Sequence, residues 1–184
     1  MSADDVTLLL NALRTGKPDA PGRLIEAVYD ELRQMADAKM RRERAGHTLQ
    51  PTALVNEAFL RLVGNQEGLE DRAHFFGAAA KAMERVLVDH ARQKQALKRG
   101  GGARGVTFLD VSAEAPDPNL DVLDVHEAIA ALDRESPDLA SLARYRYFVG
   151  LSLEQVAEIE GVSLATIKRR WTFARAWLYD RLAG

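Results

Sequence analysis

Residues 150–170 constrain the fold more than any other part of the chain, because they carry the local signals of two short helices joined by a tight turn. Ser152 is a preferred residue at a helix start, and Gln155 follows three positions later, as a capping box requires. Gly161 stands where the turn needs a positive φ angle, and Ser163 is placed to cap the second helix. This pattern predicts a helix-turn-helix.

The second helix of this unit carries polar and basic side chains in its first turns. In a helix-turn-helix these turns enter the major groove of DNA, where arginine and lysine bind guanine edges or phosphates. Trp171 and Trp177 fit helical packing better than base stacking, and Trp171 shares its spacing with Ile167, Ala174 and Leu178. The residues expected to bind DNA here are Ser163, Leu164, Ala165, Thr166, Lys168, Arg169, Arg170 and Arg175.

The rest of the chain also has helical periodicity, so the predicted fold class is all-α. Helices are expected to start near residues 4, 21, 51 and 71, and then near 121 and 137. Residues 101–120 contain glycine and proline at a density that ends a helix. We therefore expect two small helical domains, residues 1–100 and 121–184, joined by a flexible linker at 101–120, with the helix-turn-helix in the second domain.

Charge is strongly segregated along the chain. Residues 81–104 carry seven basic side chains against two acidic ones, a net charge of +5, and residues 163–184 carry a net +4. Residues 109–138 between them carry nine acidic side chains and one basic one, a net −8. Two basic blocks suggest two surfaces for a polyanion, although solvated helix faces produce the same pattern.

Several functional classes lack support in the sequence. There is no cysteine, no glycine-rich phosphate loop and no metal-ligand spacing among His47, His74, His90 and His126, so no enzyme, metal or cofactor is expected. No apolar run approaches the roughly 20 residues of a membrane helix, and the acidic start does not resemble a signal peptide. We expect a soluble, cytoplasmic protein with no membrane contact.

Three further segments carry a resemblance to a known family. Residues 54–62 (LVNEAFLRL) resemble the segment by which extracytoplasmic-function (ECF) sigma factors bind the polymerase clamp. Residues 73–83 (AHFFGAAAKAM) and 86–92 (VLVDHAR) resemble the promoter-melting helix of that family. Residues 147–152, the helix-turn-helix and residues 175–178 resemble its upstream-element domain. The chain is similar to the ECF subgroup with the AHFF and VDHAR signatures.

The resemblance implies that the first domain binds core RNA polymerase and melts the downstream promoter element. The second domain then binds the upstream element as duplex DNA, and an anti-sigma factor is a candidate partner. The implied polymerase-binding residues are Asn56, Glu57, Leu60 and Arg61. The residues expected at the downstream, partly single-stranded element are Asn65, Gln66, His74, Arg85, Asp89, Arg92, Gln93 and Lys94.

Plainer interpretations exist for both groups of residues. The polar face with Asn56 and Arg61 is also what a solvated helix face looks like, and residues 64–71 also suit an ordinary connection between helices. A conventional helix-turn-helix regulator is a second functional hypothesis, and it would bind a palindrome as a dimer. The second basic block favours the sigma factor, because such a regulator does not need it.

Overall fold

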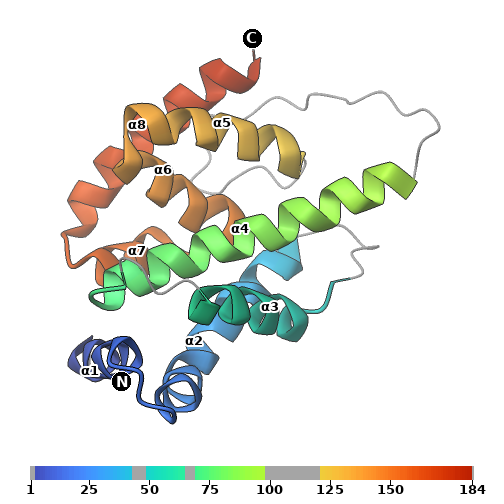
Figure 1. Ribbon diagram of the computed structural model, residues 1–184. Coiled ribbons are helices and arrows are strands. Elements are labelled where there is room, and N and C mark those ends of the chain that lie inside the picture. The colour runs from blue at the N-terminus through green and yellow to red at the C-terminus, as the bar shows by residue number, and fades with distance from the viewer. Residues whose placement is uncertain (1–2, 43–48, 65–68, 98–120, 184) are drawn as a thin grey trace.

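The computed structural model describes residues 3–42, 49–64, 69–97 and 121–183, and all regular structure within these ranges is helical (Figure 1). This confirms the predicted all-α fold class. The N-terminal part, residues 3–97, contains α1 (Ala3–Arg14), α2 (Ala20–Arg42), α3 (Pro51–Gly64) and α4 (Arg72–Leu97). Each of these helices starts within one residue of the position expected from the sequence.

The C-terminal part, residues 121–183, contains α5 (Val122–Glu135), α6 (Pro137–Arg144), the π-helical turn η1 (Tyr145–Val149), α7 (Leu153–Glu160) and α8 (Leu164–Ala183). The helix expected from residue 137 to 149 is present, but its last turn is π-helical. The Gly150 N–H donates to the Tyr145 carbonyl oxygen five residues back, and Gly150 has the left-handed φ of 75° that glycine adopts easily.

Aspartate and proline side chains define several helix starts. The Asp71 carboxylate accepts a hydrogen bond from the His74 N–H at 2.9 Å, and Asp121 accepts one from the Leu123 N–H at 2.8 Å. Each bond satisfies a backbone donor that the first turn of a helix leaves without a partner. Pro51 and Pro137 begin their helices, where the missing N–H of proline costs nothing.

The core of the N-terminal part lies where α2, α3 and α4 pack together. Phe75 and Phe76 are fully buried and meet edge to face, with ring centroids 5.3 Å apart. The Arg72 guanidinium lies over the Phe76 ring and also binds the Glu31 carboxylate, which ties the start of α4 to α2. These two phenylalanines are therefore packing residues of the core.

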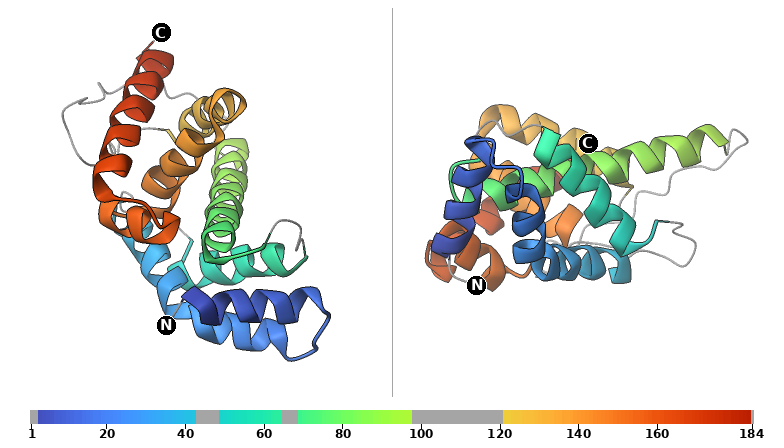
Figure 2. Two further views of the ribbon diagram at one scale, coloured as in Figure 1. Left: turned by 90° about the vertical axis from the view of Figure 1, so that its left-hand side faces the viewer. Right: turned by 60° about the horizontal axis from the view of Figure 1, so that its bottom comes forward.

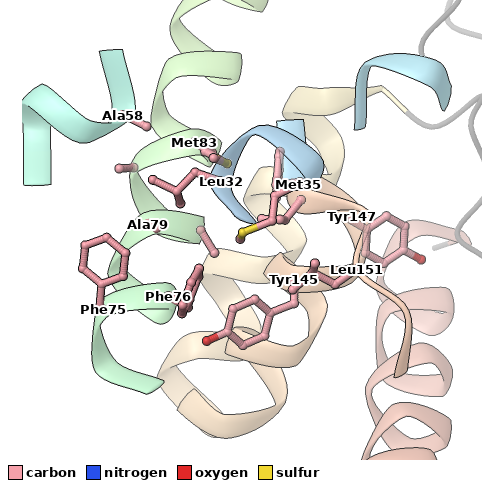
Figure 3. Packing of buried hydrophobic residues seen from close by; sticks show 14 of the residues in the cluster. Leu32, Met35, Ala58, Phe75, Phe76, Ala79, Met83, Tyr145, Tyr147 and Leu151 are labelled. Carbon is pink, nitrogen blue, oxygen red and sulfur yellow. The ribbon is translucent and has the colours of Figure 1, made fainter. Parts of the chain in front are cut away.

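One continuous hydrophobic core joins the two parts of the molecule. Helix α4 lies between α2 and α3 on one side and α5, α6 and η1 on the other (Figures 1 and 2). Figure 3 shows Phe76 of α4, Met35 of α2 and Tyr145 of η1 gathered in this shared core. The division into domains at residues 101–120 stays a prediction, because that segment lies outside the described residues.

A buried ionic network, here called the Glu84 network, crosses the boundary between the parts. Its members are Glu84, His126, Asp133 and Arg144. Arg144 Nε donates to Glu84 Oε2 at 2.8 Å, and the Arg144 guanidinium also binds both oxygens of Asp133 at 3.2 and 3.0 Å. His126 Nδ1 lies 2.8 Å from Glu84 Oε1. The side chains of Arg144 and Glu84 are only 7% and 5% exposed, so each charge needs its partner.

Acid is expected to weaken the Glu84 network through Asp133. The hydrogen bond from Arg144 lowers the pKa of this carboxyl, so its contribution to stability is present above the unfolded pKa of about 3.9 and is lost as the pH falls through the folded pKa. The variant Asp133→Asn should unfold at lower urea concentration than the wild type at pH 7, and this difference should shrink at pH 3. A difference that stays constant between the two pH values would contradict this role.

Candidate nucleic-acid interface

The helix-turn-helix has the local geometry that the sequence predicts. The Ser152 hydroxyl accepts a hydrogen bond from the Gln155 N–H at 3.2 Å, and Gln155 Oε1 accepts one from the Ser152 N–H at 2.8 Å, which completes the capping box of α7. Gly161 follows α7 with a φ of 65°. The Val162 N–H then donates to the Ala157 carbonyl oxygen at 3.1 Å and closes the turn.

The start of α8 is held by Ser163, as expected. Its hydroxyl accepts a hydrogen bond from the Thr166 N–H at 3.2 Å and lies 2.9 Å from the Thr166 hydroxyl. Both hydroxyls therefore sit at the positive end of the helix dipole, which favours an anion. The same two residues serve helix capping and are candidates for a backbone contact with DNA.

Removing the Ser163 hydroxyl is expected to destabilise the protein moderately. Loss of a helix cap of this kind costs about 1 kcal/mol. The variant Ser163→Ala should therefore lower the free energy of unfolding by about this amount in urea denaturation, whereas Ser163→Asp should preserve it because aspartate also caps helices. Equal stability of the alanine variant and the wild type would contradict the capping role.

Helix α8 has one face in the core and one face toward solvent. Ile167, Trp171, Ala174 and Leu178 are buried, which confirms their predicted packing role. Trp177 is half-buried against the core, and its indole N–H donates to Glu135 at 3.0 Å.

The solvent face of α8 carries most of the residues predicted to bind DNA. Ala165, Lys168 and Arg169 are exposed, while Leu164, Thr166 and Arg175 are half-buried. Phe173, which sequence reasoning did not single out, is 64% exposed on this helix.

Arg170 has a different environment from the other basic residues of α8. Its guanidinium donates to Glu160 at 3.0 Å and lies 3.9 Å from Asp138. Burial raises the pKa of Glu160, and the positive charge of Arg170 opposes that shift. Arg170 therefore has a structural partner in addition to its predicted role in DNA binding.

The predicted downstream-element residues lie mainly along one exposed side of α4. Arg85, Arg92 and Gln93 are exposed, and His74 is exposed at the start of the helix, where its ring nitrogen lies 3.2 Å from Asp71. Asp89 is half-buried. Lys94 lies in α4, but its side chain, like Asn65 and Gln66, is outside the described residues.

Asp89 links the α4 surface to the predicted polymerase-binding surface of α3. Arg61 donates to Asp89 at 3.0 Å and to Glu57 at 3.0 Å, and His90 lies 3.9 Å from Glu57. Leu60 precedes Arg61 in α3 and is 73% exposed, the most exposed large apolar side chain among the described residues. Asn56 is also exposed. The four residues predicted to bind polymerase thus lie close together along α3, and Leu60 is the exposed apolar one among them.

A cleft of about 620 Å³ separates the α4 surface from the helix-turn-helix. His74, Lys81 and Arg85 lie on its α4 side, and Val162 and Arg170 lie on its helix-turn-helix side. Residues from the two basic blocks of the sequence therefore face a common space. Among the described residues there is no group of three or more carboxylate and histidine side chains that could hold a metal, and no described helix is long and apolar enough to cross a membrane.

The chain was compared with models of known protein families. A model of the ECF sigma factor family matches residues 3–184. The chain belongs to the ECF sigma factor family. No curated protein is significantly similar to it.

Membership in the ECF sigma factor family confirms the family predicted from the sequence segments. ECF sigma factors are transcription factors that bind DNA and RNA polymerase during transcription initiation. The family match extends over both parts of this ECF sigma factor, so the α3 and α4 surfaces and the helix-turn-helix belong to one family unit and not to an unrelated pair of domains.

Proposed function

We propose that this ECF sigma factor binds core RNA polymerase and directs it to specific promoters. In this proposal α3 docks on the polymerase clamp, α4 binds and melts the downstream promoter element, and the first turns of α8 bind the upstream element. An anti-sigma factor is a proposed further partner, and the cytoplasm, where core polymerase resides, is the proposed compartment.

The observation that carries the proposal is the presence of three distinct surfaces on one chain. Leu60 is 73% exposed, and the other three residues predicted to bind polymerase on α3 are polar. An apolar residue with polar neighbours is typical of a protein-binding site, which has an apolar core and a polar rim. Arg85 and Arg92 give α4 an exposed basic face, and Lys168 and Arg169 give α8 another. Basic faces attract the DNA backbone without regard to sequence, while the first turns of α8 supply side chains that discriminate bases.

The proposal is tested against the alternative of a conventional regulator by mixing the full chain with core polymerase and with DNA separately. A sigma factor elutes in size-exclusion chromatography as one chain per core polymerase. A regulator elutes as a dimer, ignores core polymerase and binds a palindromic site with high affinity by itself. Formation of a stable complex with core polymerase supports the proposal, and a dimer that binds a palindrome without polymerase contradicts it.

A further inference from the structure

The exposed phenylalanine of α8 leads to an inference that rests on the proposed function. Phe173 is 64% exposed, and among the described residues only Leu8 and Leu60 are further large apolar side chains with such exposure. We propose that Phe173 is a specificity-determining residue of the upstream-element interface, and that its ring contacts the 5-methyl group of a thymine in the major groove. Three observations support this: the face of α8 on which Phe173 lies, its register along the helix, and the chemistry of the side chains around it.

Phe173 lies on the face of α8 that points away from the rest of the molecule. Helix α8 packs on α5, α6 and α7, and it runs along the edge of the molecule (Figures 1 and 2). Its buried residues are Ile167, Trp171, Ala174 and Leu178. At about 100° per residue, Phe173 lies about 40° from Arg169 around the helix axis and about 130° from the middle of the buried face. Phe173 therefore shares the solvent face with Arg169, which is also exposed.

The register of Phe173 is that of a residue able to contact bases. In a homeodomain, the residues of the recognition helix that read the major groove are spaced i, i+3, i+4 and i+7. Counted from Thr166 at the capped start of α8, these positions are Arg169, Arg170 and Phe173. Four residues of helix rise about 6 Å, nearly the height of two base pairs at about 3.4 Å each. A helix lying along the groove thus carries Phe173 about two base pairs beyond Arg169.

The surroundings of Phe173 favour nucleic acid over an apolar protein partner. Residues 163–184 carry a net charge of +4, which attracts a polyanion. Trp177, one turn further along, packs against the core. Thr172 donates its hydroxyl hydrogen to the Lys168 carbonyl oxygen at 3.0 Å and so uses it within the helix. Phe173 is therefore an exposed apolar group on a basic helix, and the thymine methyl is the apolar group that a base pair presents in the major groove.

The proposed contact has a different physical basis from those of the basic residues beside it. Lys168 and Arg169 bind phosphates or guanine edges through charge and hydrogen bonds. A ring against a methyl group instead removes apolar surface from water, so it distinguishes thymine from bases that lack the methyl group without any hydrogen bond. Burial of one methyl-sized group corresponds to about a 4-fold change in affinity. The contact should therefore respond to the loss of a single methyl group.

The test first identifies the sequence that the protein selects. The full chain with core polymerase, and the full chain alone, are each mixed with DNA duplexes that carry a randomised upstream segment, and the bound duplexes are sequenced. The wild type should select a motif with a thymine that Phe173→Ala no longer specifies, while the other positions of the motif stay the same. Leu8→Ala is the matched control, because Leu8 is a 67% exposed apolar side chain of α1. It should select the wild-type motif.

A single duplex of the selected sequence then isolates the methyl group. Replacing the specified thymine with deoxyuridine removes the methyl group and keeps the base-pairing edge. In fluorescence anisotropy, the wild type and Leu8→Ala should bind the deoxyuridine duplex about 4-fold more weakly than the thymine duplex. Phe173→Ala should bind the two duplexes equally, and Phe173→Leu, which keeps an apolar side chain, should retain part of the difference. Circular dichroism verifies that each variant keeps its helical content.

Equal binding of the two duplexes by the wild type overturns the proposal, as does a full difference retained by Phe173→Ala. A Phe173→Ala variant that binds core polymerase more weakly but selects the wild-type motif also overturns it, because Phe173 then belongs to a protein interface. If neither pool yields a motif, α8 reads no bases and the proposal fails as well. Failure of the proposed function is a separate result, because a protein that does not bind core polymerase still tests Phe173 in the selection without polymerase.

Discussion

Replacing Lys168 and Arg169 together with alanine is expected to abolish specific binding of the polymerase complex to its promoter. Both side chains are exposed in the first turns of α8, the section of a helix-turn-helix that enters the major groove. A well-formed contact of such a residue with a base is worth about 1–3 kcal/mol. Loss of two should weaken promoter binding at least about 30-fold, measured by fluorescence anisotropy of a labelled promoter fragment.

The control for this variant is Arg23→Ala with Arg33→Ala, which removes the same charge from an exposed face of α2. The salt dependence of binding supplies a second readout, because the slope of log affinity against log salt falls by about one for each lost phosphate contact. If the α2 control weakens binding as much as the α8 variant, the effect is one of net charge, and α8 is not the base-reading helix. Arg170 is left unchanged because its pairing with Glu160 would confuse stability with binding.

Replacing Leu60 with aspartate is expected to weaken binding to core polymerase by about 30-fold or more. The wild-type leucine is 73% exposed and is one of the four residues predicted to bind polymerase. Hot-spot residues cluster near the centre of an interface, and truncating one costs about 2 kcal/mol or more. A charge placed at such a position also loses its hydration without gaining a partner. The stability of the free protein should hardly change, because the side chain is already exposed to water.

Leu8→Asp provides a closely matched control for Leu60→Asp. Leu8 is also a largely exposed leucine on a helix, 67% exposed on α1, and it lies outside the predicted polymerase surface. Titration of labelled protein with core polymerase should give wild-type affinity for Leu8→Asp and reduced affinity for Leu60→Asp. Equal affinities for the two variants would show that polymerase binds elsewhere on the chain.

The sequence predicts well those features that depend on residues close together along the chain. The capping box of Ser152 and Gln155, the positive φ of Gly161 and the cap formed by Ser163 all require residues within a few positions of each other. Helix periodicity correctly assigns Ile167 and Trp171 to the core, because the position of a residue around a helix follows from its spacing alone.

Features that depend on distant residues were not predicted. Glu84 and Arg144 are 60 positions apart, and Arg61 and Asp89 are 28 positions apart, so no local pattern marks either ion pair. In the sequence Glu84 is only an acidic residue within a basic block, although it is one of the few buried charged residues described. The π-helical turn η1 is likewise not indicated by helical periodicity, and it packs against the distant helix α4.

The same distinction applies to the two predicted domains. A segment rich in glycine and proline indicates where a chain has no regular helix, but it does not indicate whether the flanking helices touch. Here α4 packs against α5, α6, α7 and η1, and their buried side chains form one core. The contact between the parts is thus a property of the tertiary structure.

The measurement that tests the central claim most directly is transcription in vitro with the purified protein, bacterial core RNA polymerase and a pool of genomic promoter fragments. The account predicts transcripts from a defined subset of promoters that require the protein and disappear with Lys168→Ala and Arg169→Ala. Core polymerase that remains inactive on every fragment, while the protein alone binds a palindromic site as a dimer, would contradict the account.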